Sequence, residues 1–451
     1  MKIKIPNRWT ARWLSTFMVV SVFLLILTTA TGQSTDDSEH EAIRYTKSAS
    51  NDPISQLQKR IDLGEVNLTY YGRHGFLRSV LEALKIPRSS QMLVFSKTSF
   101  QHQLISPEAP RALYFNDNVF VGWVQNGSVL EIATTDSQLG TVFYVLDQTK
   151  TEKPKFVRQT YECLQCHDGG MTKQVPGYMM RSIYTRVDGM PEFRAGTMLT
   201  TDSSPMQERW GGWYVTGKHG AMRHLGNAFV RGGTEFTVDT EKGANLTDLR
   251  SLLDTTPYLS KHSDIVALMV AEHQANVYNL ITRANYATRI ALEVEKEMNK
   301  ALGRPANYRS ESTTHRIEGA CDALVNALLF VGEASLRDRV TGTSGFAEEF
   351  ARKGPFDRKG RSLRQFDLKS RLMRYPLSYL IYSDAFGQLP TLSKEAVFRK
   401  LYRILGGEEK GKEFASLSSE DKKAIYEILK ETCPDFALWL AHQSKTSETF
   451  K

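Results

Sequence analysis

The sequence predicts an α+β protein, with an antiparallel, β-rich N-terminal region, a loop-rich middle segment and a mainly α-helical C-terminal half. Three observations predict this class. β-branched and aromatic runs recur between residues 112 and 148, periodicity almost vanishes between 156 and 235, and helical spacing of apolar residues dominates beyond about 245. With 451 residues, 41% of them hydrophobic, the chain is long enough for several packed regions and too apolar to be disordered.

The N-terminus, residues 1–32, has the pattern of an export signal. Basic residues without an acidic one precede the apolar run 14–30, which small residues follow. The run is long for a cleaved signal and slightly short for a spanning helix, so cleavage and retention as a single membrane anchor both stay open. We expect the rest of the chain to work in the periplasm or at the periplasmic face of the inner membrane, with residues 33–55 as a flexible tether.

The charge of the chain argues against a nucleic-acid partner. Lys and Arg number 58 and Asp and Glu 50, which gives a net charge of +8. Four of the basic residues precede the first acidic one and belong to the export segment, and no run of Lys or Arg follows. A phosphate-binding surface is therefore not expected.

The β-rich region is expected over residues 56–155. Strand-like runs at 113–115, 119–124 and 141–146 are separated by turn residues, among them Asn126-Gly127, a strong hairpin signal. These runs predict an antiparallel meander.

The helical region is expected over residues 241–451. Apolar residues at spacings of three and four predict its helices, and caps and glycines mark their ends. We predict helices over 266–284 with a stop at Gly303-x-Pro305, over 317–331, over 394–405 and from Ser418 to Cys433, besides a short one over 79–85 in the β-rich region.

The middle segment, residues 156–240, contains Cys163-Leu164-Gln165-Cys166-His167. This C-x-x-C-H string is the signature of covalent haem c attachment. Two thiols at this spacing match the two vinyl groups of one porphyrin, and a histidine directly after the second thioether is held under the ring as the proximal iron ligand. The sequence therefore predicts one covalent haem c on Cys163, Cys166 and His167.

Two other interpretations of the same residues stay open. A thioredoxin-like dithiol would need the motif at the start of a helix after a core strand, whereas polar residues precede it and Asp168-Gly169-Gly170 follows. Zinc could bind Cys163 and Cys166 with His219 and His224, but the 52 residues between the pairs exceed the usual 12–15.

Two further segments are distinctive: residues 208–220, rich in Gly and Trp and followed by Arg223-His224, and residues 374–382. With the haem motif and these segments, the chain resembles the large bacterial proteins that carry a single cytochrome c domain. The resemblance spans most of residues 105–390 and implies haem binding and electron transfer, without a substrate. It does not extend to the short helical fold of the small cytochromes.

Several residues of the middle segment are candidates for the second axial ligand of the iron. Seven of the 13 methionines lie between residues 171 and 222. We expect His219 or His224 as the distal ligand, with a methionine, Met198 or Met206 first, and an open iron as alternatives.

Several other residues each have two possible roles. Arg194, Arg209 and Arg223 are candidates for pairing with the haem propionates, because a guanidinium binds a carboxylate through two hydrogen bonds, although surface positions would explain them equally well. His273 lies on an apolar helical face and is expected to be a hydrogen-bonded core residue. Cys321 and Cys433 are either a disulfide or two buried free thiols.

The predicted function is that of an exported monohaem c-type cytochrome that transfers one electron, with a redox protein or a quinol-linked donor as partner. Because the chain far exceeds what one haem needs, a haem enzyme that activates peroxide or another small ligand beside His219, His224 or Arg223 is an alternative. A haem-based sensor, a subunit of a respiratory assembly and the zinc protein are the others.

Overall fold

A computed structural model describes residues 37–233 and 235–448. The predicted export signal or membrane anchor, residues 1–32, lies outside the described residues. Among the residues described, none of the helices has the length and apolar character needed to cross a bilayer.

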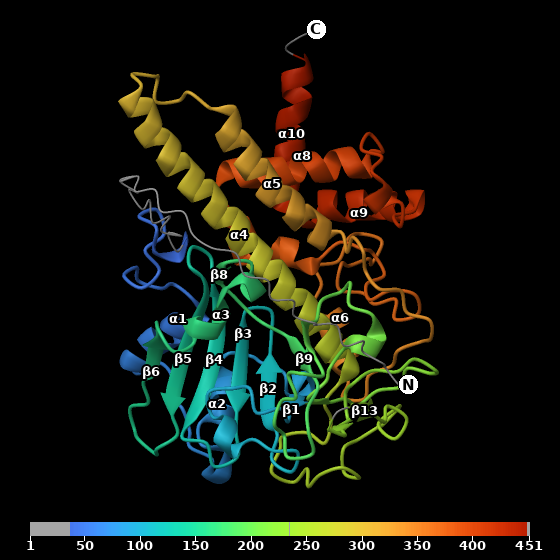
Figure 1. Ribbon diagram of the computed structural model, residues 1–451. Helices are drawn as coiled ribbons and strands as arrows, with labels where there is room; N and C mark the ends of the chain where they lie inside the picture. Colours follow the sequence, from blue (N-terminus) through green and yellow to red (C-terminus); the bar gives the residue numbers. More distant parts are fainter. Residues whose placement is uncertain (1–36, 234, 449–451) are drawn as a thin grey trace, which may run out of the picture.

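The N-terminal half is built on a seven-stranded antiparallel sheet, and the C-terminal half is mainly helical, which confirms the predicted α+β class (Figure 1). The strand order is β11-β1-β2-β3-β4-β5-β6. The predicted meander forms β2 to β5, and Asn126-Gly127 lies in the connection between β3 and β4. The strands are β1 (Met92–Val94), β2 (Arg111–Phe115), β3 (Val119–Trp123), β4 (Val129–Asp136), β5 (Gly140–Asp147), β6 (Phe156–Gln159) and β11 (Trp213–Tyr214).

The two faces of the sheet have different coverings. Side chains such as Tyr114, Val121 and Leu130 pack on one face against the helices α1 (Pro53–Asp62) and α2 (Leu77–Ala83). The opposite face, which carries Phe115 and Phe120, joins a second buried cluster that continues into the helical half. The site described below lies on that opposite face.

The helical half is organised around α4 (Ile265–Ala301), a long helix that runs diagonally from the sheet to the far end of the molecule (Figure 1). It begins one residue before the predicted start at 266 and ends two residues before the predicted stop at Gly303. Helix α9 also follows its prediction, and its Ser418 cap is confirmed. The other helices are α5 (Glu311–Leu328), α6 (Phe346–Ala351), α7 (Asp384–Gly387), α8 (Thr391–Leu405), α9 (Ser419–Thr432) and α10 (Pro434–Glu448).

Asp264 holds the start of α4 in place. Its Oδ1 accepts the backbone N–H groups of Val266 (2.8 Å) and Ala267 (3.3 Å). Its Oδ2 accepts the N–H groups of Thr343 (2.7 Å) and Ser344 (2.8 Å) and the hydroxyl of Ser344 (2.9 Å). One fully buried carboxylate therefore caps the helix and binds a loop almost eighty residues away.

Residues 37–55 do not form the expected tether. Ile43 and Tyr45 are buried, and the Tyr45 hydroxyl donates to the carbonyl of Thr141 at 2.8 Å. The prediction followed the polar composition up to Glu41, but the apolar side chains just after it anchor the segment to the sheet. Asp52, in the same segment, caps α1, whose first residues complete the segment.

The middle segment is loop-rich, as predicted, with only short pieces of regular structure. Its helix α3 (Leu164–His167) and β11 are the pieces that matter for the site. The remaining strands are β7 (Asp168–Gly169), β8 (Val175–Pro176), β9 (Arg181–Ile183), β10 (Thr197–Leu199), β12 (Val230–Arg231) and β13 (Thr237–Val238). The 3-10 turns among the described residues are η1 (Asp37–Glu39), η2 (Gly72–His74), η3 (Arg88–Ser90), η4 (His102–Leu104), η5 (Gly170–Thr172), η6 (Met206–Glu208), η7 (Tyr379–Tyr382) and η8 (Lys412–Phe414).

Candidate functional site

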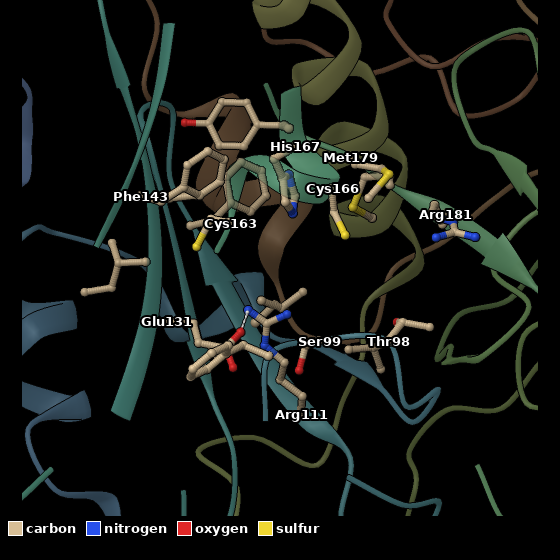
Figure 2. A pocket seen from close by; sticks show the side chains of 18 of the residues that line it. Thr98, Ser99, Arg111, Glu131, Phe143, Cys163, Cys166, His167, Met179 and Arg181 are labelled. Carbon is tan, nitrogen blue, oxygen red and sulfur yellow. Dashed lines mark ion pairs between the residues drawn. The ribbon is translucent and has the colours of Figure 1, made fainter. Parts of the chain in front are cut away.

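The C-x-x-C-H motif folds as a single helical turn. Cys163 caps α3, and its carbonyl accepts the N–H groups of Cys166 (3.3 Å) and His167 (3.0 Å). Positions i, i+3 and i+4 share one side of a helix, so the turn places both thiols and the imidazole together. All three side chains line one cavity (Figure 2).

The cavity has a volume of about 350 Å³, within the range of small-molecule sites. It lies on the face of the sheet that carries Phe120, opposite the face covered by α1 and α2. The strand register explains which side chains of the sheet line the cavity, because residues paired across antiparallel strands share a face. Phe120 pairs with Ala133, and Ala133 pairs with Phe143. The small side chain of Ala133 between two aromatic rings leaves space above the sheet, and Tyr178, Met180, Trp213 and Ala275 line the cavity from the segments that follow the motif.

His167 is oriented by a backbone carbonyl. Its Nδ1 donates to the carbonyl oxygen of Gly177 at 2.9 Å, and the Gly177 N–H donates to the His167 carbonyl at 2.8 Å. The ring of Phe143 packs against the imidazole, with the two centroids 4.9 Å apart. Burial lowers the pKa of His167, so the imidazole is neutral and its Nε2 lone pair is free to bind a metal.

Cys163 has the wrong electrostatics for the nucleophile of a redox dithiol. Cys163 and Cys166 are not joined by a disulfide. Burial, with the nearby carboxylates of Glu131 and Glu162, raises the pKa of Cys163 to about 11. A thioredoxin-like thiol has a lowered pKa, because its chemistry needs the thiolate. The dithiol interpretation therefore gains no support.

Polar groups gather at the end of the cavity away from the thiols (Figure 2). Arg111 forms an ion pair with Glu131 at 2.7 Å. Nε of Arg111 and Oγ of Ser99 are buried and have no hydrogen-bond partner among the described residues. Gly122 makes room for the guanidinium, since a Cβ there would collide with Nη2 of Arg111. These two buried donors without acceptors are groups at this end to which the acceptor oxygens of a ligand could bind.

These residues fit the haem c that the motif implies. Two thiols and a neutral imidazole lie at one end of an apolar cavity, and unpaired donors lie at the other. A haem c presents the same order of chemistry, with thioether carbons at one edge and carboxylates at the opposite edge. The orphaned donors of Arg111 and Ser99 are the observation that goes beyond the motif itself.

His219 and His224 are not brought to His167. Neither lines the cavity; their rings are buried together, with centroids 4.7 Å apart. Nδ1 of His219 donates to the carbonyl of Met222 (2.8 Å), and Nε2 accepts the N–H of Asn245 (3.0 Å), so both nitrogens are occupied. Burial, with His219 beside it, lowers the pKa of His224 to about 3.

The zinc interpretation fails on the same placement. Cys163 and Cys166 line the cavity, and the two histidines do not. Within residues 37–233 and 235–448, no group of three or more His, Cys, Asp and Glu side chains has the geometry to hold a metal ion.

The methionines at the cavity are Met179 and Met180, not the two that the sequence placed first. Met198 lies on β10 and Met206 in η6, and neither lines the cavity. Figure 2 shows Met179 at the same end as Cys166 and His167. Nothing in the sequence distinguished Met179 from the other methionines of this stretch.

The arginines chosen from the sequence also lie elsewhere. Arg209 is buried, and its Nη1 contacts Oε2 of Glu272 at 3.0 Å. Arg223 pairs with Glu241 at 2.8 Å, and Arg194 pairs with Glu192 at 3.0 Å. None of the three lines the cavity, whose arginines are Arg111 and Arg181. Arg111 could have been recognised as a charged residue on a strand face that is otherwise apolar.

His273 is a core residue, as expected. It is fully buried, with Nδ1 2.9 Å from Oδ2 of Asp202 and Nε2 2.7 Å from Oγ of Ser378. Cys321 and Cys433 are both buried and both free, so no disulfide joins them.

Comparisons of the chain with protein-family models, with curated proteins and with solved structures find no match. The motif and the cavity are therefore the features that bear on function.

Proposed function

We propose that the protein is a c-type cytochrome that binds one covalent haem and transfers single electrons between a donor and an acceptor. The observation that carries the proposal is the placement of Cys163, Cys166 and His167 on the wall of one apolar cavity. The carbonyl of Gly177 leaves Nε2 of His167 as the available ligand atom. Bound haem c supplies one-electron redox chemistry.

Each part of the cavity has a role in this proposal. Cys163 and Cys166 would hold the macrocycle through thioether bonds, and Nε2 of His167 would bind its iron. Met179, which lines the same cavity, would supply a second, thioether ligand. Arg111 and Ser99 would donate hydrogen bonds to the propionates. The apolar walls exclude water, which together with a methionine ligand favours the reduced state.

The cellular setting belongs to the same proposal. The export signal predicted over residues 1–32 would take the chain to the periplasm, where a redox protein or a quinol-linked donor would supply electrons. An anchored form would work at the periplasmic face of the inner membrane.

The proposal is tested by the chemistry of attachment. The full chain is produced in a bacterial host that has the haem c attachment machinery. We expect the denatured protein to keep its colour after acid–acetone extraction and to carry the added mass of one haem. Cys163→Ser/Cys166→Ser is expected to lose the covalent haem completely. Cys321→Ser, which changes a buried free thiol elsewhere, is the matched control and should keep it. A colourless wild-type protein without added mass contradicts the proposal.

The distal ligand is tested with carbon monoxide. The reduced wild-type protein is expected not to bind the gas, because the sulfur of Met179 would already bind the iron. In Met179→Ala, binding is expected to become nearly complete, and the weak long-wavelength band of a sulfur–ferric haem bond should disappear. Met198→Ala should resemble the wild type. Carbon monoxide binding by the wild-type protein would instead favour the enzymatic alternative, with small-ligand activation beside Arg111 and Glu131.

A further inference from the structure

We propose that Asn279, on the buried helix α4, is a positioning residue that sets the orientation of the proximal ligand His167. The inference rests on the proposed function, because it concerns how the fold holds the ligand of that same site. Asn279 is 4% exposed and does not line the cavity. It acts through the backbone of residues 177 and 178.

The side chain of Asn279 binds both backbone groups of one residue. Its Oδ1 accepts the N–H of Tyr178 at 2.8 Å, and its Nδ2 donates to the carbonyl of Tyr178 at 2.8 Å. A carboxamide that makes both bonds fixes the peptide planes on either side of Tyr178. The plane before Tyr178 contains the carbonyl of Gly177, which is the acceptor for Nδ1 of His167.

Gly177 is required for this contact. A Cβ at residue 177 would collide with Oδ1 of Asn279, and it would lie 3.0 Å from Cβ of Thr172. Any other residue would therefore push the segment away from α4. The sheet holds the same segment from the other side, since the hydroxyl of Tyr178 lies 2.8 Å from Oγ1 of Thr135. Residues 177 and 178 are thus held between helix and sheet, with little freedom to move.

The chemical consequence follows from the hydrogen bond on Nδ1. A carbonyl that accepts the Nδ1–H of a ligating histidine fixes the tautomer and ring orientation and makes Nε2 a stronger donor. A stronger donor stabilises oxidised iron more than reduced iron. Loosening the Gly177 carbonyl should therefore weaken the donor, turn the imidazole plane and raise the reduction potential. The long helix that organises the C-terminal half is in this way connected to the redox centre.

The test uses the full-length holoprotein and the variant Asn279→Asp. The substituted side chain still accepts the Tyr178 N–H but places an oxygen against the Tyr178 carbonyl. We expect the covalent haem content to stay unchanged. The equilibrium constant for one-electron reduction is expected to rise about tenfold, which is a shift of about 59 mV for one electron. The g-values of the ferric electron paramagnetic resonance spectrum, which respond to the imidazole plane, are expected to move as well. Asn279→Ser, smaller and uncharged, should give the same direction if the aspartate variant does not accumulate.

Asn285→Asp is the matched control. Asn285 is 2% exposed, lies on the same helix and donates from Nδ2 to the carbonyl of Ser137 at 3.1 Å, away from the haem motif. Oδ1 of Asn285 accepts from Nη1 of Arg289 at 3.2 Å, which would balance the charge of the substituted carboxylate. This control should show no change in potential or g-values. An unshifted potential in the Asn279 variants, or an equal shift in the control, overturns the role of Asn279. Absence of covalent haem from the wild-type protein overturns the proposed function itself, and haem content is measured first to separate the two failures.

Discussion

Replacing Arg209 by methionine is expected to lower the free energy of unfolding by about 3–5 kcal/mol, because it leaves a buried carboxylate without its partner. The guanidinium of Arg209 contacts Oε2 of Glu272 at 3.0 Å and donates to the carbonyls of Asp202 (2.9 Å) and Ser204 (2.8 Å). Glu272 is fully buried. Urea unfolding followed by circular dichroism measures the loss.

The same variant has a predictable pH dependence. Burial raises the pKa of Glu272 to about 7, and Arg209 opposes the rise. Without Arg209 the pKa rises further, so the folded state binds a proton that the unfolded state has released. Such a group contributes stability below its unfolded pKa, and that contribution is lost as the pH rises through the folded pKa. The cost of Arg209→Met should therefore be larger at pH 8 than at pH 5.

Arg223→Met and a double variant complete this experiment. Arg223 pairs with Glu241, which is exposed, so its replacement should cost far less than that of Arg209. Arg209→Met/Glu272→Met should recover much of the loss, because no unpaired charge stays buried. Equal costs for the Arg209 and Arg223 single variants would contradict the assignment of Arg209 as a structural residue.

Asp264→Ala is expected to cost about 3–4 kcal/mol, since it removes the cap of α4 together with the hydrogen bonds to Thr343 and Ser344. Three of its five bonds come from the 343–344 loop, which would be left with buried donors. Thermal unfolding and urea unfolding both report the change.

Ser310→Ala is the control with which the loss of stability in Asp264→Ala is compared. Ser310 caps α5 through one bond to the N–H of Thr313 at 3.2 Å, so its replacement should cost about 1 kcal/mol. The Asp264 variant should lose roughly three times as much. Equal losses would mean that the loop contacts contribute nothing beyond the cap.

The fold was predictable where local sequence patterns decide the structure. The Asn126-Gly127 turn and the Ser418 cap lie where the sequence predicted them, because short-range hydrogen bonds and backbone preferences determine both. The placement of residues 37–55 was not predictable in this way. Their position depends on contacts such as Tyr45 with Thr141, which lie almost a hundred residues apart.

The site divides along the same line. Cys163, Cys166 and His167, which line the cavity, were found from the sequence because the C-x-x-C-H spacing is fixed along the chain. The other residues of the cavity have no fixed spacing, so Met179 could not be separated from His219, His224, Met198 and Met206 without the fold. The use of both His219 nitrogens by Met222 and Asn245 is a tertiary fact that no periodicity reveals.

The seventh strand, β11, pairs with β1 and carries Trp213 into the cavity from a point 46 residues beyond His167. One wall is therefore missing from any nascent chain that ends before this strand. On the proposed function, a rigid macrocycle would be joined to the polypeptide before this wall is in place, and the later pairing of β11 with β1 would enclose it. Maturation would precede final folding, and mature protein stripped of its prosthetic group would have no easy route for taking it back.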